Sequence, residues 1–185
     1  MKKYERELNF YNKLNSVAEK GGVVLFGTSF ANAIPVGELR QSIRTDYKVY
    51  NRSFNDITIS DAIDVVDDAV LTLCPDKIIL MLGESDLERG YRTIDTLMED
   101  YSNLINRIKS YDNRCDLILV SVCGGDAEYP DEFNRRLMNL AKKNRCMYAD
   151  ITAVTECDIP HIKAFSLLRY FMLSRITAGD VMSYI

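Results

Sequence analysis

The sequence predicts an α/β protein, a three-layer α/β/α sandwich built on a doubly wound parallel sheet of about five strands. Segments with helical periodicity alternate with short apolar runs along the chain, which is typical of repeated βα units. The central apolar runs are continuous instead of alternating, as expected for parallel strands covered on both faces. At 185 residues the chain has the length of one domain, so we expect a single domain over residues 1–185.

The first part of the chain begins with an amphipathic helix. Residues 2–19 carry apolar side chains at helical spacing, and a pair of glycines ends the run. The next run, VVLFG at residues 23–27, is apolar up to its glycine, which favours a buried strand. A short helix over residues 36–44 and a short strand over residues 47–51 are expected next.

The middle of the chain contains the clearest helical patterns. In residues 59–73 the apolar side chains recur at three- and four-residue intervals along one face. The apolar run at residues 77–83 follows Pro75 and predicts the third strand. Residues 93–111 again place their apolar side chains on one side, so we expect a second long helix there.

The last part of the chain repeats the alternation. The run DLILVSV at residues 116–122 predicts a fourth strand, and a helix is expected from Pro130 to Asn144. A fifth strand is expected over residues 146–151, and a terminal helix begins at about Ile162.

Composition excludes several classes of function. The net charge is -4 and the pI is about 5.1, so the chain lacks the basic footprint of a nucleic-acid partner. No apolar run reaches the length of a signal peptide core or a membrane span, so we expect a cytoplasmic protein without a membrane partner. The sequence does not predict an oligomeric state.

The cysteines and the single histidine argue against a metal site. The five cysteines are spread through the chain without a C-x-x-C pair, and one histidine is present, so we expect reduced thiols and no bound metal. Dinucleotide, phosphate-loop and zincin motifs are missing from the sequence, so we expect no cofactor.

Polar residues follow the predicted strands, and ligands of such sheets bind outside the carboxyl ends of the strands. The candidates, in chain order, are Thr28-Ser29, Asn55-Asp56, Gly83-Glu84-Ser85-Asp86 and the distant Asp158 and His161. Ser29 also allows a purely structural interpretation, because serine is a favoured helix cap.

In their order and spacing, these blocks resemble the SGNH hydrolases, also called GDSL-type esterases and lipases. The resemblance spans residues 23 to about 175. Gly27 and Ser29 match the serine block, Gly83 and Asp86 match the ends of a G-x-N-D block, and Asp158 and His161 match a D-x-x-H pair. It implies a flavodoxin-like SGNH-hydrolase fold.

The resemblance further implies a serine esterase that cleaves a small acyl or acetyl ester through an acyl-enzyme. Ser29 would be the nucleophile, His161 its base, and Asp158 the residue that orients the imidazole. The oxyanion would be held by backbone groups near Ser29 and Asp56, or Asn55 if the alignment shifts by one, with Ser85 and Gly83 in the same binding region.

The chain also departs from the family pattern. Ser85 stands where the family has asparagine, Asp56 stands where it has glycine, and Thr28 replaces an aspartate. Asp56 and Glu84 would bring carboxylates near a forming anion unless they point away or pair with Arg52 or Arg89. The alternative interpretation is therefore a non-catalytic SGNH-fold protein that binds a small molecule or a partner protein in the crevice at the carboxyl ends of the strands.

Overall fold

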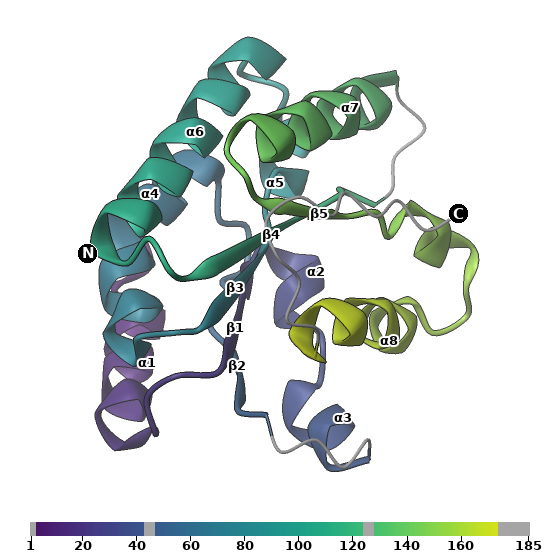
Figure 1. Cartoon of the computed structure of the whole chain (residues 1–185). Helices are drawn as coiled ribbons and strands as arrows, with labels where there is room; N and C mark the ends of the chain where they lie inside the picture. The colour runs from purple at the N-terminus through teal and green to yellow at the C-terminus, as the bar shows by residue number, and fades with distance from the viewer. Residues whose placement is uncertain (1–2, 43–46, 124–127, 174–185) are drawn as a thin grey trace.

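The computed structural model describes residues 3–42, 47–123 and 128–173. Its centre is a five-stranded, wholly parallel sheet with the strand order β2-β1-β3-β4-β5 (Figure 1). The strands are β1 (Val23–Gly27), β2 (Val49–Asn51), β3 (Lys77–Met81), β4 (Asp116–Val120) and β5 (Met147–Ala149).

Helices cover both faces of this sheet (Figure 1). One face carries α1 (Glu5–Val17), α4 (Ile59–Ala69), α6 (Ile94–Tyr111) and α7 (Glu128–Lys143). The other carries α2 (Ser29–Asn32), α3 (Val36–Ser42) and α8 (Pro160–Leu173). The remaining elements are α5 (Glu84–Arg89) and two short 3-10 helices, η1 (Leu71–Leu73) and η2 (Thr152–Glu156). The predicted three-layer, doubly wound architecture is confirmed.

Alternation along the strands divides the buried side chains into two apolar cores. Val24, Phe26, Ile78 and Leu80 point into the core beneath α1, α4, α6 and α7. Their strand neighbours, such as Leu25 and Ile79, point into the core beneath α3 and α8. All of these side chains are fully buried, which explains why the strands read as continuous apolar runs.

The strand order places a crevice at the carboxyl ends of β1 and β3. The chain winds outward from β1 to β2 on one side and from β3 to β5 on the other, so the direction of winding changes between β1 and β3. Ligands of open parallel sheets bind at such a switch point. Gly27 pairs with Met81 in the register, so the residues after both strands begin side by side.

Gly27 is required for this close approach. A Cβ atom at this position would lie 2.4 Å from the Met81 carbonyl oxygen and 2.8 Å from Ala31 Cβ. The glycine therefore lets β1 turn directly into α2 against β3.

Candidate active site

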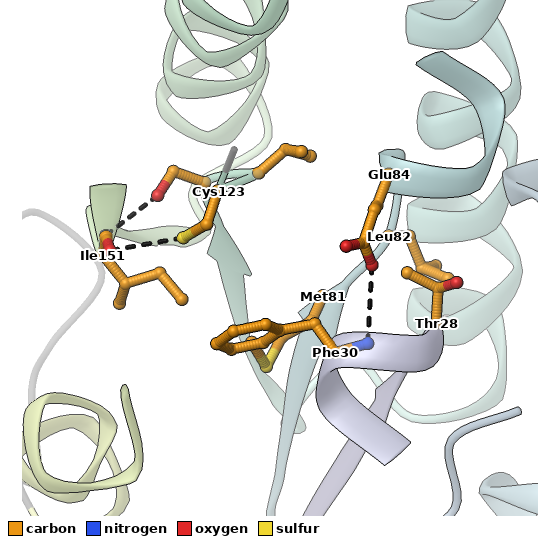
Figure 2. A pocket seen from close by; sticks show the side chains of 9 residues that line it. Thr28, Phe30, Met81, Leu82, Glu84, Cys123 and Ile151 are labelled. Atoms are coloured by element: carbon orange, nitrogen blue, oxygen red, sulfur yellow. Dashed lines mark hydrogen bonds between the residues drawn. The ribbon is translucent and has the colours of Figure 1, made fainter. Parts of the chain in front are cut away.

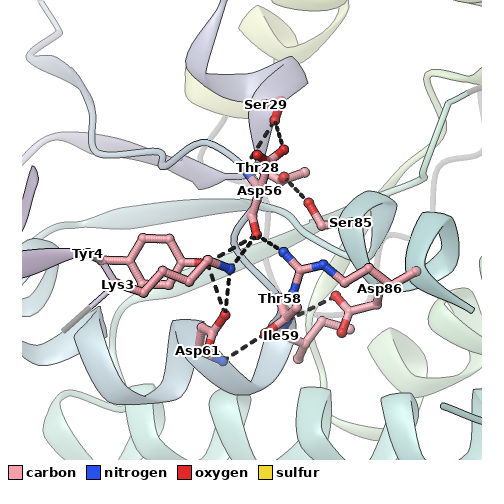
Figure 3. Close-up of polar contacts among 11 residues, drawn as sticks. Lys3, Tyr4, Thr28, Ser29, Asp56, Thr58, Ile59, Asp61, Ser85 and Asp86 are labelled. Carbon is pink, nitrogen blue, oxygen red and sulfur yellow. Dashed lines mark hydrogen bonds and ion pairs between the residues drawn. The ribbon is translucent and has the colours of Figure 1, made fainter. Parts of the chain in front are cut away.

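Ser29 lies at the carboxyl end of β1 and is the first residue of the short helix α2 (Figure 3). The N-cap of α2 is the preceding residue, Thr28, in an extended conformation. Ser29 therefore does not serve as the helix cap, and its half-buried side chain is directed to a neighbouring loop. In the described part of the chain its backbone N–H has no acceptor, as is usual at the start of a helix.

The neighbouring loop contacts Ser29 through Asp56, which lies between β2 and α4. The Asp56 backbone N–H donates to Ser29 Oγ at 3.1 Å, and Ser29 Oγ donates to Asp56 Oδ1 at 3.2 Å. Two backbone N–H groups, those of Ser29 and Asp56, thus lie around one hydroxyl. Such groups are suitable donors for the oxyanion of an acyl-transfer reaction.

The backbone of Asp56 has the left-handed conformation, with φ of 53°, which favours glycine. Its carbonyl oxygen accepts a hydrogen bond from Arg89 Nη2 at 2.6 Å, and the Tyr4 hydroxyl lies 3.0 Å away (Figure 3). Lys3 Nζ donates to the same oxygen at 3.4 Å. These contacts fix the peptide that follows Asp56 and so restrain the main chain of this residue. The left-handed backbone also explains why glycine is suitable at the position that Asp56 occupies.

Asn55 and Arg52 form hydrogen bonds with residues other than Ser29. Asn55 Oδ1 accepts a hydrogen bond from Asn32 at 2.9 Å, so of the two sequence candidates in this loop only Asp56 contacts the serine. Arg52 is buried and donates to Asn15 Oδ1 at 2.8 Å. Arg89 bonds the carbonyl of Asp56 and not its carboxylate. Neither arginine therefore neutralises a carboxylate beside Ser29.

Ser85 lies beneath the site. Its Oγ is 2.6 Å from Thr28 Oγ1, and both side chains are buried. This hydrogen bond joins the start of α5, which follows β3, to Thr28, which follows β1. The Ser85 hydroxyl thus supports the backbone that carries Ser29 instead of facing the Ser29 hydroxyl.

Gly83 has a packing role at the start of α5. Its φ is 116°, and a Cβ atom there would lie 2.4 Å from Cζ of Phe133 on α7. Only glycine fits this position without moving the phenyl ring.

Asp86 joins α5 to the start of α4. Its Oδ2 accepts the Ile59 backbone N–H at 3.0 Å, at the first residue of α4. Burial raises the pKa of Asp86 to about 6, because the charged form loses hydration. The residue positions the segment that follows Asp56.

His161 contacts Phe30, the residue that follows Ser29. The rings of His161 and Phe30 stack with centroids 4.5 Å apart and an interplanar angle of 27°. Across the described ranges, His161 makes no hydrogen bond with Ser29, and exposed Asp158 makes none with His161. The structure thus joins Ser29 to Asp56 by hydrogen bonds and places His161 against Phe30, while in the described ranges the exposed Asp158 bonds none of these residues.

Thr28 and Phe30, the two chain neighbours of Ser29, line a small hollow (Figure 2). Glu84 lies in its wall and accepts the Phe30 backbone N–H at 3.4 Å. Burial raises the pKa of Glu84, and the charges of Glu88 and Asp56 act in the same direction. Cys123 also lines the hollow, where burial raises its thiol pKa to about 12, so it is no thiolate nucleophile at neutral pH.

Sequence reasoning missed Phe30 and Cys123 as site residues. Two signals were available in the sequence. Phe30 is an aromatic residue directly after the candidate nucleophile, and Cys123 directly follows the predicted fourth strand. In the parts of the chain that the structure describes, no group of three or more His, Cys, Asp or Glu side chains could hold a metal ion. No described helix is long and apolar enough to span a membrane.

No protein-family model matches this sequence, and no curated protein matches it. Solved structures do match its fold. A protein from Streptococcus pneumonia, solved under the description of a platelet activating factor, aligns with a TM-score of 0.79 at 15% identity, covering 92% of this chain and 93% of that chain. A GDSL-like lipase from Bacteroides thetaiotaomicron aligns with a TM-score of 0.66 at 15% identity over 78% of this chain and 77% of that chain.

A third neighbour is a catalytic serine-to-alanine mutant of an acetylxylan esterase from Geobacillus stearothermophilus. It aligns with a TM-score of 0.65 at 17% identity, covering 90% of this chain and 99% of that chain. The chain therefore has the fold of these esterases and lipases, which confirms the structural resemblance seen in the sequence. At sequence identities of 15% and 17%, the similarity to these proteins shows the fold alone.

Proposed function

We propose that this chain is an SGNH-type serine esterase that cleaves a small acyl or acetyl ester through an acyl-enzyme, without a cofactor. One observation carries the proposal: the Ser29 hydroxyl lies at the topological switch point, within hydrogen-bond reach of a backbone N–H held by a left-handed residue. The single imidazole of the chain stacks on the next residue. The esterases and lipases with the same fold support this assignment.

In the proposed mechanism, Ser29 Oγ attacks the ester carbonyl carbon and His161 takes the hydroxyl proton. The N–H groups of Ser29 and Asp56 stabilise the oxyanion. The carbon–oxygen bond to the alcohol then breaks, and the imidazolium returns its proton to the leaving oxygen. Water attacks the acyl-enzyme with His161 as base, which releases the acid and regenerates Ser29. Asp158 would orient the imidazole in this cycle.

Substrate binding has to open the hydrogen bond between Ser29 Oγ and the Asp56 carboxylate so that the hydroxyl proton can pass to His161. Catalytic hydrogen bonds are often long or misaligned without ligand and tighten in the complex. We also propose that the protein acts in the cytoplasm, because its five cysteines are free, as expected in a reducing compartment.

A fluorophosphonate probe tests the assignment of Ser29, since it reacts with activated serine hydroxyls. We expect the wild type and the exposed-serine control Ser60→Ala to be labelled, and Ser29→Ala to be spared. His161→Gln should slow labelling by about 10²-fold or more, because it removes the base. Equal labelling of Ser29→Ala and wild type, or no labelling of wild type, would contradict the proposal.

The second candidate is a non-catalytic protein of the same fold that binds a small molecule or a partner protein in the crevice. Two observations favour it: the Ser29 hydroxyl donates to Asp56 Oδ1 and not to an imidazole, and Asp158 is exposed. An unlabelled wild type without ester turnover would support this candidate. Labelling confined to Ser29 would exclude it.

A further inference from the structure

The hollow beside Ser29 contains one carboxylate among mostly apolar walls. Phe30, Met81, Leu82, Val122 and Ile151 supply most of the lining, and Glu84 supplies the charge (Figure 2). The Glu84 carboxylate accepts one long hydrogen bond, from Phe30 N–H. A half-buried carboxylate with so few donors is costly to ionise, and a cationic ligand would offset that cost.

No cation of the protein supplies that compensation in the described ranges. The charged side chains that act on Glu84 are Glu88 and Asp56, and both disfavour its ionised form. Arg89, on the same short helix, is directed to the Asp56 carbonyl oxygen. Glu84 thus contacts the residue next to the nucleophile in a locally negative environment.

The size of the hollow restricts what can neutralise Glu84. Its free volume is about 20 Å³, which is room for little more than one water molecule. An ammonium group is of that size and has three donors, whereas a guanidinium or a quaternary ammonium is larger. The ring of Phe30 in the wall is a further favourable neighbour for a cation.

We propose that the acyl group of the substrate carries a primary ammonium close to its carbonyl, so that the substrate is an aminoacyl ester. This inference rests on the proposed esterase function and specifies its substrate class. The carbonyl carbon bonds to Ser29 Oγ while the ammonium enters the hollow and donates to Glu84. The alcohol leaves with the proton from His161, and water then releases the free amino acid. Glu84 is the specificity residue and takes no part in the proton transfers.

The test compares the glycyl and propionyl esters of 4-nitrophenol, whose acyl groups have the same size and differ by an ammonium in place of a methyl group. Rates are measured near pH 7, where an α-ammonium is largely protonated, and are corrected for spontaneous hydrolysis. We expect kcat/KM to favour the glycyl ester in the wild type. In Glu84→Gln the ratio of glycyl to propionyl kcat/KM should fall about tenfold or more, because a charged hydrogen bond is lost.

Glu99→Gln on α6 is the control, since it removes an exposed carboxylate that is not among the charges acting on Glu84, and it should leave the ratio within about twofold of wild type. A wild type that prefers the propionyl ester, or an unchanged ratio in Glu84→Gln, would overturn the proposal.

A binding measurement separates this inference from the esterase assignment. Glycinamide and propionamide present the same acyl groups without a cleavable ester. Their binding is followed by NMR at the backbone amides of Phe30 and Cys123. We expect glycinamide to bind more tightly to the wild type and to lose this preference in Glu84→Gln. If fluorophosphonate labelling fails while this preference holds, the esterase assignment is wrong and the ammonium site stands. If labelling succeeds and no preference appears, the substrate class is wrong.

Discussion

Asp56 presents two opposing groups to the candidate nucleophile. Its backbone N–H is a donor suited to a forming oxyanion, while its carboxylate accepts a hydrogen bond from the Ser29 hydroxyl and adds negative charge beside the same point. The contacts of Arg89 and Tyr4 are made to the backbone carbonyl of Asp56, so they restrain its main chain without using its side chain. The two contributions of this residue can therefore be separated by substitution.

We expect Asp56→Asn to raise kcat/KM for a neutral ester about tenfold, the equivalent of about 1.4 kcal/mol in the barrier. Asparagine tolerates the left-handed conformation and keeps the backbone donor, so only the charge near the oxyanion is removed. Steady-state hydrolysis of 4-nitrophenyl propionate measures the effect. Asp64→Asn, which removes an exposed charge from α4, should leave the rate unchanged. A rate at or below wild type in Asp56→Asn would show that the carboxylate assists the reaction.

At the level of single residues, the sequence was sufficient to place Ser29 and Asp56. Both follow predicted strands, and the ends of neighbouring parallel strands lie together. The relation of Asp158 to His161 could not be predicted in the same way, because it depends on side-chain orientation in the irregular segment between η2 and α8. The stacking of His161 on Phe30 likewise depends on how α8 packs against the sheet.

Among the elements, the long helices were predicted from periodicity and the strands from their continuous apolar runs, whereas α2 and α5 were not predicted. α2 has 4 residues and α5 has 6, too few for an apolar repeat to show. The helix predicted over residues 59–73 instead divides at Val70 into α4 and η1, and Cys74 then adopts a left-handed conformation. α7 begins at Glu128, before Pro130, because proline is tolerated in the first turn of a helix.

Substitutions at three glycines, Gly83 and Gly90 at the two ends of α5 and Gly37 in α3, separate the effect of steric overlap from that of backbone strain. Gly83→Ala should lower the free energy of unfolding by about 3 kcal/mol or more, because its Cβ would overlap the Phe133 ring and its φ is positive. Gly90 also has a positive φ but meets open space, so Gly90→Ala should cost about 1–2 kcal/mol. Urea unfolding monitored by circular dichroism measures each change.

Gly37 is the control for this series, because it lies in α3 and a Cβ atom added there would have nothing within 4 Å. Gly37→Ala should stabilise the protein by about 0.5–1 kcal/mol, since alanine is the better helix former. Equal costs for Gly83→Ala and Gly90→Ala would show that the ring of Phe133 moves aside freely, and that α5 is not held against α7 through this glycine.

For the molecule as a whole, the alternation of elements predicted the layers and the parallel sheet. The order of the strands in the sheet depends on which face each connection between parallel strands passes over. Local sequence patterns do not contain that information. That order brings the loops after β1, β2 and β3 to one edge. Polar side chains that follow these strands are consequently buried, and Asp86, at 5% exposure, is the carboxylate among them.

Asp86 should make the stability of the whole molecule depend on pH. Its pKa is raised from 3.8 to about 6 by burial, so the folded state favours the protonated form. The penalty for ionisation is therefore absent below about pH 4, grows between pH 4 and 6, and is complete above pH 6. We expect the free energy of unfolding of wild type to fall relative to that of Asp86→Asn by about 2 kcal/mol between pH 4.5 and 7.5.

The change with pH is the informative quantity in this experiment. The amide of Asp86→Asn retains an acceptor for the Ile59 N–H, but it places an NH₂ group where Asp86 Oδ1 has no hydrogen-bond partner in the described structure. That cost is the same at every pH, so it shifts the curve without changing its slope. Asp64→Asn, at an exposed position of α4, should run parallel to wild type. If the difference between Asp86→Asn and wild type were constant from pH 4.5 to 7.5, Asp86 would titrate normally, and burial at the start of α4 would not control its charge.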